Sequence, residues 1–315
     1  MSKVAVVGAG AVGTAIAYAA QIRGVCRRLA LYDVDAAKVR AEVLDLNHGL
    51  QFTPMAQIVG GDDLEVCAGS DVVVITAGAK QKPGQTRLDL AAANVEMCRG
   101  LVPRLVAIAP DALLLVVTNP VDVVTFAAQQ FSGWPSHRVF GSGTVLDSSR
   151  LRFLIAEHTG VAVQNVHAYI AGEHGDSEVP LWSTASIGGV PVQDWSHTGD
   201  TPLDAAARAA IHERVVRAAY EIIAGKGATS LAIGLAVARI LEAVLHDEHR
   251  VLPVSSRLDD VHGVSGVCLS MPSVVGRQGV ERVLPTPLSA EERTQLLVSA
   301  EAVRSAAQSL GLSDH

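Results

Sequence analysis

The 315-residue chain is short of charged residues and of basic clusters, and each shortage excludes a class of protein. Charged residues make up 18% of the chain and hydrophobic residues 49%, which is typical of a globular protein and leaves little room for disorder. At about 150 residues per domain, the length predicts one large or two medium domains. The net charge of −7, with no lysine- or arginine-rich run, argues against a nucleic-acid partner.

Cysteine is also scarce, and its four residues form no C-x-x-C pair: they are Cys26, Cys67, Cys98 and Cys268. This spacing predicts buried free thiols in a reducing compartment rather than a disulfide or zinc framework. No pair of histidines has the spacing of an H-E-x-x-H site, so no metal is expected.

One stretch superficially resembles a secretory signal, the largely apolar residues 4–20. Gly8, Gly10 and Gly13 interrupt it, and glycines this dense weaken a continuous apolar helix. We therefore predict a strand, a tight turn and a helix in succession. No other run reaches the ~18 apolar residues of a membrane span, and we expect a cytoplasmic protein with no membrane partner.

The first half of the chain alternates strand-like and helix-like segments. Apolar strands that alternate with helices predict a parallel sheet covered by helices on both faces. The predicted strands span residues 3–7, 29–32, 57–60, 71–75, 112–117 and 138–140. The predicted helices span residues 11–23, 35–48 and 87–108, with a further helix after Pro120.

The pattern changes from about Gly141, which predicts one domain over residues 1–141 and a second over 142–315. The second half has predicted helices around short strands, and a β-rich meander over 250–284. Because no low-complexity linker separates the halves, we expect them to share an extensive interface. The predicted helices of the second half span residues 145–158, 204–224, 229–246 and 289–310.

The sequence GAGAVG over residues 8–13 is a G-x-G-x-x-G motif between a predicted strand and a predicted helix, and Asp33 follows its last glycine by 20 residues. Glycines let the backbone approach a pyrophosphate, and the helix N-terminus supplies N–H donors and a positive dipole end. Asp33 would accept hydrogen bonds from both ribose hydroxyls and repel a 2′-phosphate. The motif therefore predicts NAD rather than NADP, the alternative being a glycine-rich turn without a ligand.

A nicotinamide cofactor moves a hydride, so the substrate site must supply a proton. His174, within GEHGD over 172–176, is a candidate for this role. Asp147 and Arg150 are three residues apart on one predicted helix and project from one face. An aspartate that orients an imidazole, beside an arginine that grips a carboxylate, suits a 2-oxo acid. Taken alone, the two residues favour an ordinary ion pair on a helix surface.

Five motifs, in this order along nearly the whole chain, resemble the L-lactate and malate dehydrogenase family. They are VGAGAVG (7–13), TAGAKQKPGQTR (76–87), TNPVD (118–122), GTVLDSSR (143–150) and GEHGD (172–176). The resemblance implies an α/β fold, with a doubly wound parallel sheet (Rossmann domain) that binds the cofactor, followed by an α+β catalytic domain.

The resemblance also implies catalytic roles by position. His174 matches the family's proton donor and acceptor, and Asp147 matches the carboxylate that orients it and stabilises its protonated form. Arg150 matches the clamp for the substrate carboxylate. Arg87, which follows a loop over 79–86 that is expected to close over the substrate, would polarise the reacting carbonyl. A catalytically silent relative is expected to lack at least one of these four residues, and all four are present.

Gln81 distinguishes the two main branches of this family. Members that act on oxaloacetate carry arginine here, whereas lactate dehydrogenases carry glutamine. Arg150 already neutralises one carboxylate, and a second one against a neutral amide would be an unpaired buried charge. The resemblance therefore favours pyruvate and L-lactate, the alternative being malate or another L-2-hydroxy acid. Asn119 would bond near the reacting oxygen, and Thr229 would line the substrate pocket.

Two further sets of positions are implied by the resemblance. Arg152 and His167 match the pair that binds fructose 1,6-bisphosphate between subunits in allosteric bacterial members, which implies a homotetramer. The alternative is two scattered basic residues on the surface. The positions that match cofactor-binding residues are Gly8, Gly10, Val12, Gly13, Asp33, Lys38, Gly78, Ala79, Asn119 and Ser142.

Overall fold

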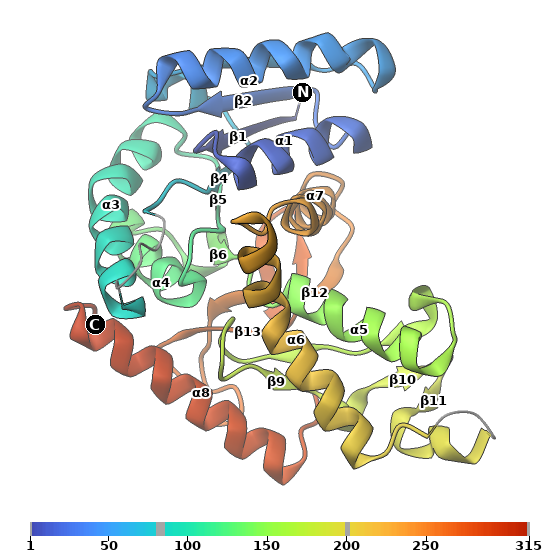
Figure 1. Cartoon of the computed structure of the whole chain (residues 1–315). Helices are drawn as coiled ribbons and strands as arrows, with labels where there is room; N and C mark the ends of the chain where they lie inside the picture. Colours follow the sequence, from blue (N-terminus) through green and yellow to red (C-terminus); the bar gives the residue numbers. More distant parts are fainter. Residues whose placement is uncertain (1, 80–85, 199–201, 314–315) are drawn as a thin grey trace.

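A nine-stranded sheet runs through the centre of the computed structural model, which describes residues 2–79, 86–198 and 202–313 (Figure 1). From one edge to the other, the strand order is β14-β13-β12-β6-β5-β4-β1-β2-β3. These strands are β1 (Lys3–Val7), β2 (Arg28–Tyr32), β3 (Gln57–Gly61), β4 (Val72–Ile75), β5 (Leu113–Val116), β6 (Val139–Gly141), β12 (Arg250–Arg257), β13 (Cys268–Gly276) and β14 (Gly279–Val283).

The six strands of the first half are all parallel and follow the order β3-β2-β1-β4-β5-β6. The chain builds outward from β1 in one direction and from β4 in the other, so the carboxyl ends of these two neighbours form a topological switch point. The predicted doubly wound parallel sheet is therefore confirmed. Its flanking helices are α1 (Ala11–Arg23), α2 (Ala36–His48), α3 (Arg87–Ile108) and α4 (Val121–Ser132).

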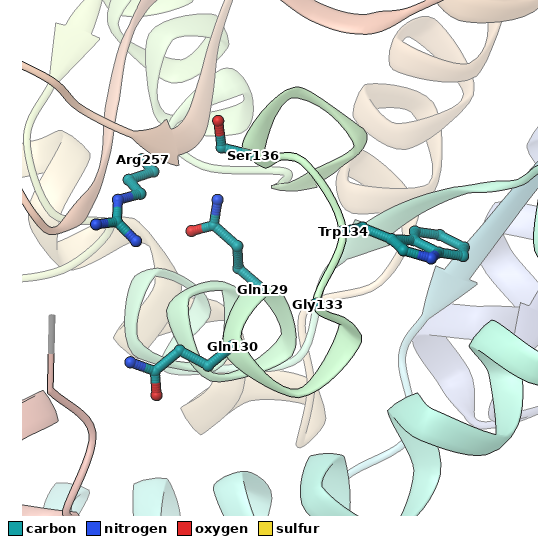
Figure 2. Close-up of a pocket in the computed structure, with 6 residues that line it drawn as sticks. All are labelled: Gln129, Gln130, Gly133, Trp134, Ser136 and Arg257. Carbon is teal, nitrogen blue, oxygen red and sulfur yellow. The ribbon is translucent and has the colours of Figure 1, made fainter. Parts of the chain in front are cut away.

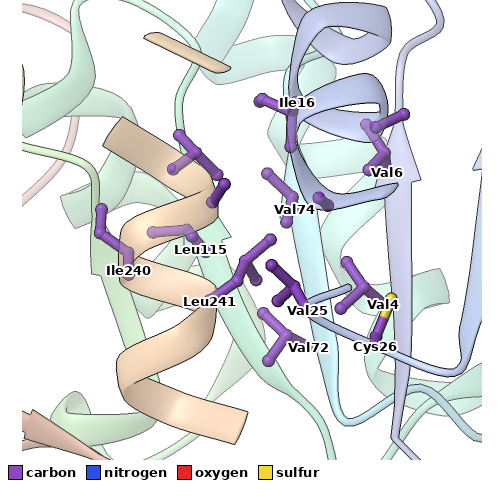
Figure 3. Close-up of a cluster of buried hydrophobic side chains, with 14 of the residues drawn as sticks. Val4, Val6, Ile16, Val25, Cys26, Val72, Val74, Leu115, Ile240 and Leu241 are labelled. Carbon is purple, nitrogen blue, oxygen red and sulfur yellow. The ribbon is translucent and has the colours of Figure 1, made fainter. Parts of the chain in front are cut away.

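Successive residues of a strand point to opposite faces, and both faces of this sheet are apolar. Val4 and Val6 of β1 belong to one core, shared with α1, α2 and the later helix α7 (Leu231–Leu245), and Figure 3 shows part of it. Ala5 and Val7 belong to a second core, shared with α3 and α4. This two-sided burial explains why the strands are nearly continuous runs of valine, leucine and isoleucine.

Three helices begin one residue after the predicted position, because the polar side chain at the predicted position caps the helix. Asp35, Asp204 and Ser289 each accept a hydrogen bond from the backbone N–H three residues later, at 3.0, 2.8 and 3.2 Å. Each was predicted as the first residue of a helix and is instead the residue just before it. The helices of the second half are α5 (Val145–Thr159), α6 (Ala205–Lys226), α7 and α8 (Ala290–Ser309).

The β-rich meander of the second half does not form a separate sheet. Its strand β12 pairs antiparallel with β6 through Ser255 and Gly141, and β13 and β14 extend the sheet beyond it. The core sheet thus crosses the predicted boundary at 141/142. Two smaller sheets lie outside it, formed by β7 (Val166–His167), β10 (Ser186–Ile187) and β11 (Val190–Pro191), and by β8 (Ile170–Ala171) and β9 (Val179–Pro180).

The four cysteines lie in the interior of the protein. All four cysteines are buried and none of the four is in a disulfide, as predicted, and burial raises the pKa of the Cys67 and Cys98 thiols to about 12. Such thiols stay protonated at neutral pH and are poor nucleophiles.

Among the described helices, none combines the length and the hydrophobicity that a membrane crossing requires.

Helix α7 of the second half packs directly on the cofactor-side helix α1, as Figure 1 shows. The two backbones approach closely at Gly234, where a Cβ atom would lie 2.5 Å from the carbonyl oxygen of Ala15. Near the other end of the crossing, Arg23 of α1 donates to both carboxylate oxygens of Glu242 on α7, at 2.5 and 2.8 Å. The close packing of α7 on α1 therefore depends on glycine at position 234.

We predict that Gly234→Ala destabilises the protein by about 1–3 kcal/mol, because the new methyl group meets fixed backbone and must push α1 and α7 apart. Urea unfolding at neutral pH measures the change. Gly100→Ala in the exposed middle of α3 is the matched control, since a Cβ there meets no described atom within 4 Å. The control should be neutral or stabilising by up to ~1 kcal/mol, and equal destabilisation of both variants would contradict the argument.

Candidate active site

Three predicted residues meet at the start of α5. Asp147 lies in the first turn of this helix and is 2% exposed. Its Oδ2 is 2.5 Å from Nδ1 of His174, and its Oδ1 accepts a hydrogen bond from Nη1 of Arg150 at 2.7 Å. The spacing of Asp147 and Arg150 does place them on one helix face, but this face is buried. An ordinary surface ion pair is therefore excluded.

The charge of this cluster follows from its contacts. Burial by itself would lower the pKa of His174, but the charge of Asp147 and its hydrogen bond outweigh burial and raise that pKa to about 9. Burial likewise opposes the Asp147 carboxylate, but His174 and Arg150 outweigh it and keep the pKa of Asp147 below its ordinary value. At neutral pH the imidazole is thus protonated, with Nδ1 bound to Asp147 and the Nε2–H left for other partners.

The segment that carries His174 is held by three different elements. The backbone N–H groups of Gly172, Glu173 and His174 donate in turn to β13, α8 and α4. The acceptors are the Ser270 carbonyl oxygen at 2.8 Å, Ser299 Oγ at 2.7 Å and Asp122 Oδ2 at 2.8 Å. Sequence reasoning missed the last two side chains. Asp122 belongs to the TNPVD motif and could have been found there, whereas nothing near Ser299 in the sequence indicates its contact.

A second acid–base pair lies beside the cluster. Glu178 is buried, and burial together with the charge of Asp147 raises its pKa to about 9. Its Oε1 is 3.8 Å from Nε2 of His212 on α6, and burial lowers the pKa of that imidazole. Because Glu178 is uncharged at neutral pH, the charges of the cluster are two positive, His174 and Arg150, and one negative, Asp147. These three residues together carry +1, and the Asp122 carboxylate, bonded to the backbone of His174, balances that charge at neutral pH.

The G-x-G-x-x-G turn forms a cradle of the shape that a dinucleotide requires. A Cβ on Gly13 would lie 1.8 Å from the carbonyl oxygen of Gly8, so α1 starts close against β1. Gly8 itself has φ +105°, a left-handed value that favours glycine. A Cβ on Gly10 would meet no described atom within 4 Å, so the backbone there is open to an approaching phosphate. Val12 lies in the first turn of α1.

Asp33 lies at the end of β2, facing this turn. Its Oδ2 accepts from the N–H of Ala9 at 2.8 Å and is 3.4 Å from Nζ of Lys38. Partial burial opposes its ionisation, but the N–H groups of Asp35 and Ala9 and the Lys38 ammonium outweigh burial and lower the pKa of Asp33. The carboxylate is thus charged at neutral pH and fits a ribose better than a 2′-phosphate.

The other predicted positions follow the ends of the neighbouring strands. Gly78 and Ala79 come after β4, Asn119 after β5 and Ser142 after β6. Asn94 of α3 joins two of these loops, since it accepts from Ala79 N–H and donates to the Asn119 carbonyl oxygen, both at 2.7 Å. They share the carboxyl edge where ligands bind in such sheets.

Three predicted substrate positions are not joined to the cluster by described contacts. Thr229 lies between α6 and α7 and is half-buried. Gln81 lies outside the described residues, as does most of the predicted closing loop. Arg87 is the first residue of α3, and its side chain lies outside the described part of the chain.

The two predicted effector residues belong to elements that contact each other, α5 and β7. Arg152 on α5 donates from Nε to the carbonyl oxygen of Ala168 at 2.8 Å, and its guanidinium lies 4.7 Å from the ring centre of Tyr169. His167, beside Ala168 in β7, is exposed. The two basic residues therefore belong to neighbouring elements rather than being scattered.

A surface hollow of about 520 Å³ lies elsewhere, near the C-terminal end of α4 (Figure 2). Its lining includes none of the predicted site residues, so it does not coincide with the cluster around His174. The lining residues are Gln129, Gln130, Gly133, Trp134, Ser136 and Arg257.

Comparison with known families matches both halves of the chain. Residues 2–141 match the NAD-binding domain of lactate/malate dehydrogenase. Residues 144–310 match the alpha/beta C-terminal domain of lactate/malate dehydrogenase. The two matches together span nearly all of the described residues.

Individual relatives are similar over their full length. The L-lactate dehydrogenase of Bifidobacterium animalis subsp. lactis is 55% identical over 98% of this chain and 97% of its own. The L-lactate dehydrogenase of Synechococcus sp. is 49% identical over 98% and 99%. Among solved structures, a lactate dehydrogenase from a Medee basin deep-sea metagenome library has a TM-score of 0.95 at 40% identity, covering 98% of this chain and 99% of its own.

We predict that Asp147→Asn lowers the pKa of His174 by about two units, because burial then acts against a weaker partner. Histidine NMR titration measures this shift. Since the folded pKa exceeds the unfolded value of about 6.5, the bond contributes stability fully below pH ~6.5 and loses it as the pH rises through about 9. The free energy of unfolding should therefore fall between pH 7 and 9, and less so in the variant.

The matched control is Glu157→Gln, which neutralises a carboxylate on the same helix. Glu157 is exposed and pairs with Arg214 at 2.8 Å. It should leave the titration of His174 unchanged. An unshifted His174 in Asp147→Asn would show that the buried carboxylate does not hold the proton.

Proposed function

This chain belongs to the lactate/malate dehydrogenase family, and we propose that it catalyses the NADH-dependent, reversible reduction of pyruvate to L-lactate. The observation that carries the proposal is the cluster that His174 and Arg150 form on the buried carboxylate of Asp147. It combines a proton donor with a guanidinium that can bind a carboxylate, and these are the two groups that reduction of a 2-oxo acid requires.

The single described guanidinium of this cluster favours a substrate with one carboxylate. Arg150 bonds Asp147 through Nη1 alone, and no other described acceptor bonds its remaining nitrogens. Arg150 could therefore pair with the carboxylate of pyruvate, whereas the second carboxylate of oxaloacetate would be unpaired. Gln81 supports the same choice through the family resemblance, since a neutral amide there cannot pair with a second carboxylate.

When bound, NADH would supply a hydride for the carbonyl carbon of the substrate. Arg150 holds the substrate carboxylate and so orients the carbonyl toward the imidazole. His174 donates its Nε2 proton to the carbonyl oxygen, and Asp147 keeps the ring oriented through Nδ1. In the reverse direction, the neutral imidazole takes the hydroxyl proton of L-lactate. By resemblance, Arg87 would polarise the same oxygen, Asn119 would hydrogen-bond near it, and Thr229 would line the pocket.

The cofactor would lie along the carboxyl edge of the sheet. The N-terminus of α1 would bind its pyrophosphate, and Asp33 would bind the adenosine ribose. Lys38, Gly78, Ala79 and Ser142 would complete its contacts. We also propose a cytoplasmic location, since the protein would draw on NADH and none of its four cysteines is in a disulfide.

We propose further that the protein is a homotetramer activated by fructose 1,6-bisphosphate at Arg152 and His167. Two basic side chains on neighbouring elements, one of them exposed, suit a phosphate. Arg152 shares α5 with Asp147 and Arg150, so a shift of this helix would reach the cluster. Phe52 and Met55 are 87% and 73% exposed, which supports burial in an assembly.

A substrate panel tests the reaction. With NADH, kcat/KM for pyruvate should exceed that for oxaloacetate by about 100-fold or more, because an unpaired buried carboxylate costs ~3–5 kcal/mol. The panel includes 2-oxoisocaproate, which tests for a larger pocket. His174→Asn is the control: it should abolish turnover and leave NADH binding, measured by fluorescence, nearly intact. Faster turnover of oxaloacetate than of pyruvate would overturn the proposal.

Steady-state kinetics at neutral pH test the effector. Fructose 1,6-bisphosphate should lower the KM for pyruvate, and Arg152→Gln should raise the half-activating concentration about tenfold or more, since a charge-assisted hydrogen bond contributes ~1.5–3 kcal/mol. Arg214→Gln, an exposed arginine on α6, is the control and should change neither value. Identical pyruvate saturation curves with and without the sugar bisphosphate would contradict activation, and a monomer mass by light scattering would contradict the tetramer.

A further inference from the structure

Asp122 is a buried carboxylate that has no role in the proposed reaction as described above. It lies in the first turn of α4, three residues after Asn119, and is 2% exposed. Its Oδ2 accepts from the backbone N–H of His174 at 2.8 Å, and its Oδ1 accepts from Ser255 Oγ of β12 at 2.6 Å. One side chain from the cofactor half thus joins two elements of the other half at the imidazole.

We propose that Asp122 is a positioning residue for His174, which fixes the imidazole relative to the helix after Asn119 and supplies a second negative charge that favours the protonated ring. This inference rests on the proposed function, because it assigns a role within the same site. Asp122 bonds the backbone of His174, and no described hydrogen bond joins its carboxylate to the ring, so it acts by positioning the residue and by its charge.

Of the three backbone N–H groups that anchor this segment, only that of His174 donates to a charged acceptor. Gly172 donates to a carbonyl and Glu173 to the hydroxyl of Ser299. A hydroxyl would have been enough to hold the backbone. A carboxylate costs more to bury than a hydroxyl, so its charge needs a separate reason. The neighbouring imidazolium supplies that reason, since opposite charges stabilise each other in a buried site.

Several elements that pack around the imidazole contribute charged or titratable side chains, and these together set the pKa of His174. Asp122 adds to the effect of Asp147 and raises the pKa of His174 further. Burial raises the pKa of Asp122 itself to about 6, against the hydrogen bonds from Ser255 and His174, so it is ionised where His174 titrates. Among the described residues, these groups are Asp147 and Arg150 on α5, Asp122 on α4, Glu173, Asp176 and Glu178 on the segment of His174, and His212 on α6.

Asp122→Asn tests the role of the charge. The amide keeps the shape of the side chain and can still accept a hydrogen bond, but it removes the negative charge. The kcat for pyruvate should fall about 10- to 100-fold, as for other residues that orient a functional imidazole. The alkaline limb of the pH–kcat profile should move to lower pH by about half a unit to one unit. NADH binding should stay within about twofold.

Ser299→Ala is the matched control, because it removes the neutral anchor of the adjacent residue Glu173. It loosens the same segment without changing its charge, so kcat can fall while the alkaline limb stays in place. If Asp122→Asn also left the limb in place, Asp122 would be an ordinary backbone anchor and the proposal would be overturned. An equal shift in both variants would overturn it too, since the charge would then not be the cause.

Histidine NMR titration of Asp122→Asn separates this inference from the proposed function. If the unmodified protein failed to reduce pyruvate, the proposed function would fail, yet a lowered pKa of His174 in the variant would still support the second charge. If Asp122→Asn did not fold, as judged by circular dichroism, Ser255→Ala would carry the test, because it frees Oδ1 but keeps the carboxylate. Its kcat should fall about two- to tenfold with the limb unmoved, and an unchanged kcat would overturn the positioning role.

Discussion

The buried carboxylate of Asp147 is the group on which the rest of the site depends. It binds an imidazole at 2.5 Å and a guanidinium at 2.7 Å while almost fully removed from solvent. Burial of the Asp147 carboxylate is costly, and its attraction to the two cationic side chains offsets that cost. Because of this attraction, His174 keeps a proton that burial alone would remove, and Arg150 is held on the same carboxylate. The arrangement places a protonated imidazole and a guanidinium where an anionic substrate would bind.

The scaffold around this cluster draws on both halves of the chain. Asp122, from the cofactor half, holds the backbone of His174. Strand β12 of the second half extends the sheet of the first half beyond β6. Helix α7 crosses α1 at Gly234, so the helix whose N-terminus would bind the pyrophosphate also contacts the catalytic half. A displacement of one half would therefore move the imidazole relative to the cofactor cradle.

Much of the fold could be predicted because its signals are local. The alternation of apolar runs and helices, the turn between Gly8 and Gly13 and the capping residue Ser289 each depend on neighbours in sequence. The candidate site was predictable only in part. The contacts of His174 with Asp122 and of Glu173 with Ser299 span 52 and 126 residues, so no spacing rule could indicate them.

The sequence by itself determined the parallel sheet with helices on both faces, the glycine cradle with Asp33 and the shared helix face of Asp147 and Arg150, because strand period, turn geometry and helix pitch are properties of the local chain. Only the tertiary structure decided that this face is buried, that His174 is protonated there, and that β12 pairs with β6. Burial and pairing depend on which distant residues lie opposite, and the proton of His174 depends on both.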